Sequence, residues 1–197
     1  MTSDVGLRTD VQSVLSRFEH ADPRQVDLAG DYRDFVQAHE DAVWRSCSVG
    51  HVTASALVID ATSDSVLLTL HPKVGRWLQL GGHLEMGDVS LREAALREVE
   101  EESGLATGEI SSSPIRLDRH PVPCGRNADG TVARSVHWDV QYVVRVTGTP
   151  RPRISSESDD LRWFAAEALP DVDDSVRALI ADARASLRAP TTWVSCG

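Results

Sequence analysis

The spacing of apolar residues changes near residue 50, and this change restricts the fold class. Before it, apolar residues recur every three or four positions on either side of Pro23, which predicts two helices. After it, residues 51–59 and 65–70 form short runs rich in Val, Ile and Leu around a turn-like segment, which predicts two strands of a hairpin. The apolar residues of the two helical stripes are Val11, Val14, Leu15, Phe18, Leu28, Tyr32, Phe35 and Val36.

Further along the chain, helical and strand-like segments alternate. Apolar residues at helical spacing predict a helix over 90–103, which Gly104 ends, and we interpret Gly81 and Gly82 before it as a turn. Strands are expected over 136–146 and 161–164, and a last helix over about 172–187. This order favours an α/β or α+β sandwich. We expect an N-terminal helical extension (1–48), one main domain (49–190) and a C-terminal tail (191–197).

Charge and composition exclude several classes of protein. The 197 residues carry 20 Lys and Arg against 30 Asp and Glu, a net charge of −10, which disfavours binding to nucleic acid or to anionic membranes. No apolar stretch approaches the ~20 residues that span a bilayer, and the first residues lack the apolar core of a signal peptide, so we expect a cytoplasmic protein. The three Cys residues are widely spaced, which fits neither a disulfide framework nor a zinc knuckle.

Three glutamates of the helix expected over 90–103 point to a metal ion. Glu98, Glu101 and Glu102 stand at positions i, i+3 and i+4 and therefore share one helix face. Carboxylates so close repel one another, and a divalent cation would remove the repulsion. The alternative is a solvated acidic face. The apolar residues 94–96 before the run and the double glycine upstream favour the metal site over this alternative.

The same segment resembles the signature of the Nudix hydrolases. Residues 97–105, REVEEESGL, match the conserved core of that signature, and Gly82 stands at its first position. The chain departs from the signature twice in the loop between Gly82 and Arg97. Asp88 stands where the signature has Glu, and eight residues instead of seven separate Asp88 from Arg97. We extend the resemblance to roughly residues 50–187. It implies a Nudix-type α/β/α sandwich with a mixed β-sheet, here preceded by the N-terminal helical extension.

The resemblance also implies a ligand set for Mg²⁺ or Mn²⁺. At matching positions of the family, Glu98 and Glu102 would be principal ligands, Glu101 would add a ligand or a water contact, and the carbonyl of Gly81 would complete the site. Glu157, in a loop before a strand, is a further candidate for a metal ligand or the general base, and equally for an ordinary loop carboxylate.

The reaction implied by the family is attack of water on one phosphorus of a nucleoside diphosphate derivative. Arg97 would hold the carboxylates through its planar guanidinium, and Glu98 would take the proton from the water. We therefore expect Glu98, Arg97 and Glu101 to be the catalytic group. The residues do not select one nucleotide derivative, because loops outside the signature make that choice.

Candidate substrate-binding residues lie outside the signature. Arg76 and Trp77 could hold a phosphate and stack a base, although such a Trp is more often part of a core. His137 and Asp139 alternate on one expected strand and share a face. With His83, His120 and Cys124 they could form a second metal site, but ordinary polar contacts are the favoured interpretation.

Two other functions and the assembly state stay open. An isopentenyl-diphosphate isomerase would need a Cys and a Glu over a diphosphate, and Cys124 and Glu157 show no convincing arrangement for this. A non-catalytic nucleotide-sensing module would not need the complete set of glutamates. The apolar stripes of the extension must cover either the domain itself or a second subunit, so a homodimer is possible.

Overall fold

The structure is a computed structural model that describes residues 2–106, 108–126, 132–155 and 158–196. Its helices are α1 (Thr2–Ser16), α2 (Pro23–Ala38), α3 (Leu91–Ser103) and α4 (Asp174–Ser186). Its strands are β1 (His51–Asp60), β2 (Ser65–His71), β3 (Arg76–Leu78), β4 (Leu80–His83), β5 (Glu109–Ser111), β6 (Arg116–Arg126), β7 (Val132–Val146), β8 (Asp160–Ala165) and β9 (Trp193–Ser195). Within these residues, none of the helices has both the length and the apolar character that crossing a membrane requires.

Strand β1 is the centre of a mixed sheet. It pairs in parallel with β7 along its whole length and antiparallel with β2 and β4 on its other side. The strands follow the order β3-β2-β1-β7-β5-β9, while β4, β6 and β8 pair with β1, β7 and β2. Every residue of β1 is buried, which is expected of a strand with both faces covered.

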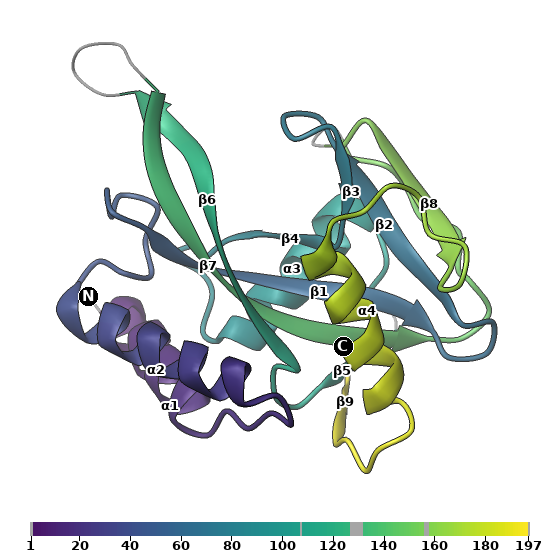
Figure 1. Ribbon diagram of the computed structural model, residues 1–197, viewed down its shortest axis with the longest axis horizontal. Coiled ribbons are helices and arrows are strands. Elements are labelled where there is room, and N and C mark those ends of the chain that lie inside the picture. Colours follow the sequence, from purple (N-terminus) through teal and green to yellow (C-terminus); the bar gives the residue numbers. More distant parts are fainter. Residues whose placement is uncertain (1, 107, 127–131, 156–157, 197) are drawn as a thin grey trace.

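Helices cover both faces of this sheet (Figure 1). On one face α1, α2 and α3 pack against β1 residues such as Val52 and Ala54 in one apolar core. On the other face α4 packs against Leu57, Ile59 and Val143 in a second core. The α/β/α sandwich with a mixed sheet and N-terminal helices is therefore confirmed.

Helix α3 begins and ends at residues that the sequence marks. The Ser90 hydroxyl accepts from the backbone N–H of Glu93 at 3.2 Å, and Gly104 adopts the left-handed conformation (φ 67°) beyond the last turn. A third contact comes from α1, where the Asp10 carboxylate accepts from the N–H of Leu91 at 2.8 Å. The N-terminal extension thus contacts the helix that carries the three glutamates.

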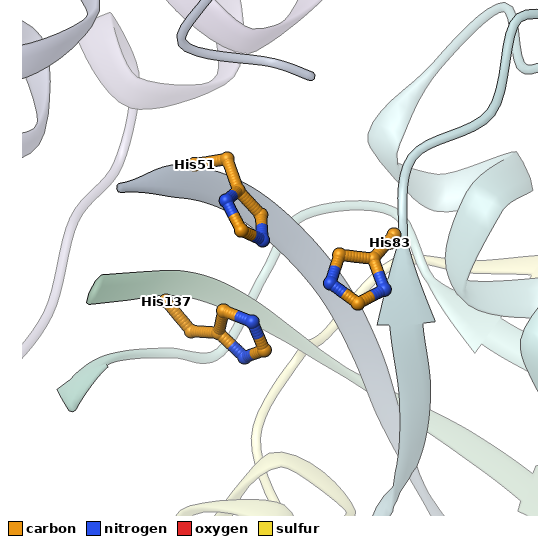
Figure 2. A group of neighbouring side chains, drawn as sticks. All are labelled: His51, His83 and His137. Carbon is orange, nitrogen blue, oxygen red and sulfur yellow. The ribbon is translucent and has the colours of Figure 1, made fainter. Parts of the chain in front are cut away.

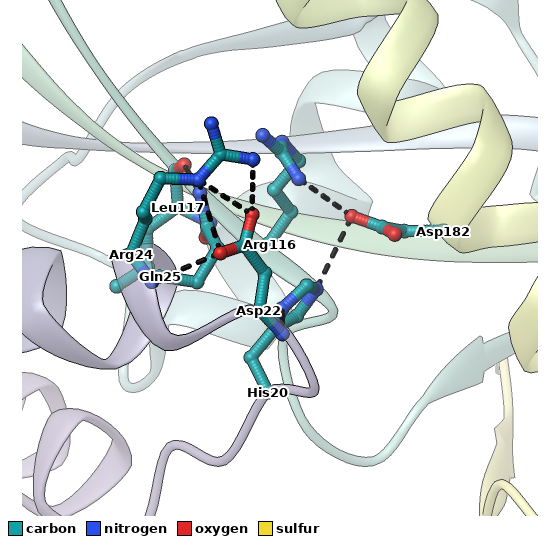
Figure 3. A network of polar contacts seen from close by, with 7 residues as sticks. All are labelled: His20, Asp22, Arg24, Gln25, Arg116, Leu117 and Asp182. Carbon is teal, nitrogen blue, oxygen red and sulfur yellow. Dashed lines mark hydrogen bonds and ion pairs between the residues drawn. The ribbon is translucent and has the colours of Figure 1, made fainter.

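The extension is joined to β6 and α4 by polar contacts (Figure 3). The buried side chain of Gln25 donates to the carbonyl of Leu117 at 3.0 Å and accepts from its N–H at 2.8 Å. His20, in the segment between α1 and α2, and Arg116 both contact the Asp182 carboxylate of α4, at 3.2 and 2.7 Å. Because Val11, Leu15, Tyr32 and Val36 are also fully buried, their apolar stripes cover the chain's own domain.

Several sequence expectations need correction. Gly81 and Gly82 lie in strand β4, paired with Ser55 and Ala54, and do not form a turn. Strand β6 was not expected, because its sequence RLDRHPVPCGR alternates poorly and contains two prolines. Residues 193–195, expected in the tail, form the short edge strand β9 against β5.

Candidate active site

Arg97 is the centre of the glutamate cluster on α3. Its guanidinium donates to Glu98 at 3.0 Å, to Glu101 at 2.9 Å and to Asp88 at 3.0 and 3.1 Å. A fifth hydrogen bond, at 2.9 Å, reaches the carbonyl of His83 at the end of β4. Burial opposes the charge, but the hydrogen bonds and charges of Asp88 and Glu98 outweigh it and raise the pKa of Arg97. Arg97 therefore stays charged and ties α3 to β4.

Asp88 takes part in this arrangement despite the altered loop. It is buried, and its carboxylate also accepts from the N–H of Glu85 at 2.7 Å, which closes the loop that connects β4 to α3. Although Asp is shorter than the Glu of the signature and the loop is one residue longer, the Asp88 carboxylate still binds Arg97.

The three glutamates differ in exposure. Glu98 and Glu102 are buried, at 7% and 9% exposure, whereas the side chain of Glu101 is 57% exposed. Strand β4 passes close to Glu98, because a Cβ atom added to Gly82 would lie 2.7 Å from its Oε1 atom. Glycine at this position leaves room for the carboxylate between strand and helix.

The donor set fits a hard divalent cation. Asp88, Glu98 and Glu101 share the one guanidinium of Arg97, and Glu102 adds another buried carboxylate on the same helix face. This surplus of negative charge in a partly buried place favours a cation, and carboxylate and carbonyl oxygens are the ligands that Mg²⁺ and Mn²⁺ prefer.

A polar group on β1 and β7 lies on the opposite face of the sheet from α3. The buried Asp139 carboxylate accepts from Thr53 (2.9 Å), Ser55 (2.6 Å), Gln79 (3.2 Å) and Gln141 (3.1 Å). Burial raises the pKa of Asp139 even though these donors favour the charged form. With its oxygens so engaged, Asp139 holds neighbouring polar side chains in place.

Three histidines meet next to this group, at the ends of β1 and β4 and on β7 (Figure 2). The rings of His51, His83 and His137 lie 4.8 to 5.2 Å apart between centroids. Burial lowers the pKa of all three, to about 4 for His83 and about 3 for His137, so the rings are neutral at pH 7. The sequence singled out His83 and His137 but not His51.

The other residues considered from sequence lie in different surroundings. Trp77 packs edge-on against Phe164 at 4.8 Å in the second core, and Arg76 beside it is exposed. The His120 ring donates from Nδ1 to the Asp118 carboxylate at 2.6 Å, and its centroid lies 5.5 Å from that of His137. Cys124 lies in β6, and Glu157 lies outside the described residues.

The comparisons with known proteins place this arrangement in a family. The family model of the NUDIX domain matches residues 49–183. The m7GpppN-mRNA hydrolase NUDT17 of Xenopus laevis is 39% identical over 69 residues, which are 32% of this chain and 22% of that protein. The chain thus matches about a fifth of the length of that relative.

Two solved structures are similar to this chain, and the first of them shows that the fold is shared. A NUDIX-family hydrolase from Clostridium perfringens covers 70% of this chain and 96% of its own, with a TM-score of 0.52 and 24% identity. A MutT NUDIX hydrolase from Burkholderia pseudomallei covers 66% and 95%, with a TM-score of 0.48 and 23% identity. The chain therefore belongs to the NUDIX family.

Proposed function

We propose that this protein hydrolyses a pyrophosphate bond in a nucleoside diphosphate derivative and that it needs Mg²⁺ or Mn²⁺ to do so. The observation that carries the proposal is the clamp formed by Arg97, which holds Glu98 and Glu101 at 3.0 and 2.9 Å beside strand β4. This arrangement keeps a set of carboxylates together that would otherwise separate through mutual repulsion.

Each residue of the cluster has a role in this proposal. Glu98, Glu101 and Glu102 would hold the cation, with the backbone carbonyl of Gly81 as a further oxygen ligand. When bound, the cation would neutralise the charge of the pyrophosphate oxygens and lower the pKa of the attacking water. Arg97 orients the carboxylates through several hydrogen bonds, which a lysine could not reproduce.

The chemical step needs no covalent intermediate. Water attacks one phosphorus, a P–O bond forms, the bridging P–O bond breaks, and the released phosphate derivative leaves with the electron pair. A carboxylate takes the proton of the water, and we assign this to Glu98, with Glu157 as the alternative base. Of the contacts to the rest of the substrate that the sequence suggested, we keep the exposed Arg76. Trp77 packs against the second core, and His137 and Asp139 lie on the face of the sheet away from α3, so we do not assign this role to them.

A panel of substrates with the full chain tests this function. Purified protein is incubated with nucleoside diphosphate sugars, dinucleotides, dinucleoside polyphosphates and capped RNA, with Mg²⁺, Mn²⁺ or excess EDTA. We expect hydrolysis of at least one compound, abolished by EDTA and restored by either cation. Reaction in H₂¹⁸O identifies the attacked phosphorus by mass spectrometry. Undiminished hydrolysis in EDTA would contradict the metal dependence.

Glutamine variants on α3 separate the metal site from a solvated acidic face. We expect Glu102→Gln to lower turnover by orders of magnitude while the free energy of unfolding stays unchanged or rises slightly, since a repelling charge is removed. Glu100→Gln is the matched control, because Glu100 is exposed on the same helix. Equal turnover of the two variants would favour the solvated face.

The homodimer stays a prediction, but the apolar stripes of α1 and α2 no longer support it. The stripes of α1 and α2 are buried within the chain, so a dimer would have to use another surface. Sedimentation equilibrium of the full chain measures its mass and decides between monomer and dimer.

A further inference from the structure

The three histidines come from three adjacent strands and point to one place on the sheet. In the parallel pair of β1 and β7, His51 lies directly opposite His137. In the antiparallel pair of β1 and β4, His83 lies opposite Thr53, which shares its face of β1 with His51. All three side chains therefore lie on the same face, and Figure 2 shows the rings turned toward a common space.

The ring nitrogens of this group are placed for a shared ligand. One nitrogen from each ring lies within 4.8 Å of the others. Among the described residues, no hydrogen bond of ordinary distance and angle reaches either nitrogen of His51 or Nε2 of His83, although the backbone of Cys47 lies near enough to His51 to act on its pKa. His51 is only 1% exposed, so bulk solvent does not reach these nitrogens. Buried polar atoms are normally paired, and their convergence here calls for an explanation.

We propose that His51, His83 and His137 form a binding site for a transition-metal ion of the Zn²⁺ type, separate from the glutamate cluster. Imidazole nitrogen suits Zn²⁺ and its neighbours in the first transition series, whereas Mg²⁺ prefers oxygen. Three histidines leave one tetrahedral position open, as in zinc sites that bind water or a substrate atom.

The geometry requires only small side-chain movements. Zinc–nitrogen bonds of 2.0–2.1 Å place two tetrahedral nitrogens about 3.4 Å apart, so the observed spacing must contract by at most about 1.4 Å. Rotation of the rings about their side-chain bonds supplies such a shift without moving the strands.

The site is distinct from the carboxylates of α3. Successive residues of a strand point to opposite faces, so Gly82 faces Glu98 while His83 faces away from it. The two sites therefore lie on opposite sides of β4 and differ in ligand chemistry. Metal selectivity follows from this difference, with oxygen ligands for one ion and nitrogen ligands for the other.

Metal titration of the untagged full chain tests the proposal. The protein is stripped with chelator and kept in millimolar Mg²⁺, so that the glutamate cluster is supplied with its own ion. Zn²⁺ is then titrated in competition with a chromogenic chelator, and Co²⁺ binding is followed by its visible absorption. We expect one tightly bound ion per chain. Absence of such binding would overturn the proposal.

Variants show which residues hold the ion. His83→Asn and His137→Asn should each weaken Zn²⁺ binding at least about 100-fold, more than the loss of an outer-shell partner. Both residues are only partly buried, and circular dichroism confirms that each variant is folded. Unchanged affinity in both folded variants would overturn the proposal.

Two control variants exclude other sites. His39→Asn alters a second group of potential ligands, formed by His39, Asp41 and Cys47, and should leave the affinity unchanged. Glu98→Gln alters the glutamate cluster and should also leave it unchanged. Loss of Zn²⁺ binding in either control would assign the ion to that other place and overturn the proposal.

Discussion

Gly82 shows how a single missing side chain can determine the glutamate site. A Cβ atom at this position would meet the Glu98 carboxylate at 2.7 to 2.8 Å, which is closer than non-bonded contacts of Cβ atoms allow. Because the carboxylate is the flexible end of a side chain, it would move and the strand would stay. The position of Glu98 thus depends on the absence of a methyl group in β4.

We predict that Gly82→Ala lowers turnover at least about 10-fold, since a displacement of about 1 Å in a reacting group has effects of this order. Stability should fall by less than about 1.5 kcal/mol, because only a movable side chain is displaced. Initial rates at several Mg²⁺ concentrations and chemical denaturation measure the two effects. Gly87→Ala is the control, as its Cβ would meet nothing within 4 Å. Equal rates for both variants would contradict the prediction.

Asp60 provides a pH-dependent contribution to stability. Its buried carboxylate accepts from the hydroxyl and N–H of Thr62, from Ser63, and from the N–H groups of Gly148 and Thr149. Burial opposes the charge, but these hydrogen bonds outweigh it and hold the pKa of Asp60 well below its usual value. The charged carboxylate therefore joins the end of β1 to the turn that follows it and to the segment after β7.

We predict that Asp60→Ala lowers the free energy of unfolding by about 3 kcal/mol at pH 7. This is the upper end of the range for a hydrogen bond to a charged group. A lowered folded-state pKa stabilises the protein above the unfolded value of about 3.9, and this stabilisation is lost as the pH falls below that value. The difference between wild type and variant should therefore shrink between pH 5 and pH 3 in urea denaturation. Asp27→Asn, at an exposed site, is the control for the loss of one negative charge. A pH-independent difference for Asp60→Ala would refute this assignment.

The residues of the glutamate site could be predicted from sequence to different degrees. Glu98, Glu101 and Glu102 are neighbours on one helix, so spacing alone places them on one face. Arg97 and Asp88 are close in sequence as well, and the structure joins them. His51 could not be found in this way, because its approach to His83 and His137 depends on the register of three strands that are distant in sequence.

At the scale of elements, those with a clear local pattern agree with the sequence analysis. Helix α3 has both caps and a regular apolar face, and β1 contains the apolar run 56–59. Strand β6 lacks such a pattern. It is stabilised instead by its long pairing with β7 and by the hydrogen bond between Leu117 and Gln25. Strand β4 exists because β1 pairs with it, although glycines disfavour strands. Such pairings are tertiary and cannot be read from local preference.

Helix α3 is capped by a residue from a different helix, and this gives a prediction for α1. Asp10→Ala removes the acceptor of the Leu91 N–H and a negative charge near the helix N-terminus, so stability should fall by about 1 kcal/mol. Asp10→Asn keeps an acceptor and should cost less. Thermal and urea unfolding measure both. We expect activity per folded molecule to be unchanged, because Asp10 acts on the start of α3. A large loss of activity in the folded Asp10→Ala protein would show that the N-terminal extension contributes to catalysis.

At the scale of the whole molecule, the N-terminal helices and the matched domain share one core. Leu7, Val11 and Leu15 of α1 lie in the same apolar cluster as Ala94 and Val99 of α3 and Tyr142 of β7. The Tyr32 hydroxyl lies 2.6 and 2.9 Å from the carbonyl oxygens of Asp118 and Asp139, so α2 is joined to β6 and β7. A division near residue 48 would therefore pass through a continuous core.

We predict that the full chain unfolds as one cooperative unit. Leu15→Ala, in the core shared with α1, and Leu179→Ala, in the core beneath α4, should each destabilise the protein by about 2–5 kcal/mol, since both side chains are fully buried. Calorimetry should show one unfolding transition for the full chain, with equal calorimetric and van't Hoff enthalpies. Each variant should lower the temperature of this transition and leave it undivided. Two transitions, of which Leu15→Ala moved only one, would show instead that residues 1–48 form an independent unit. In that case, deleting them would leave a folded domain, whereas a shared core predicts that the deletion exposes apolar surface and causes aggregation.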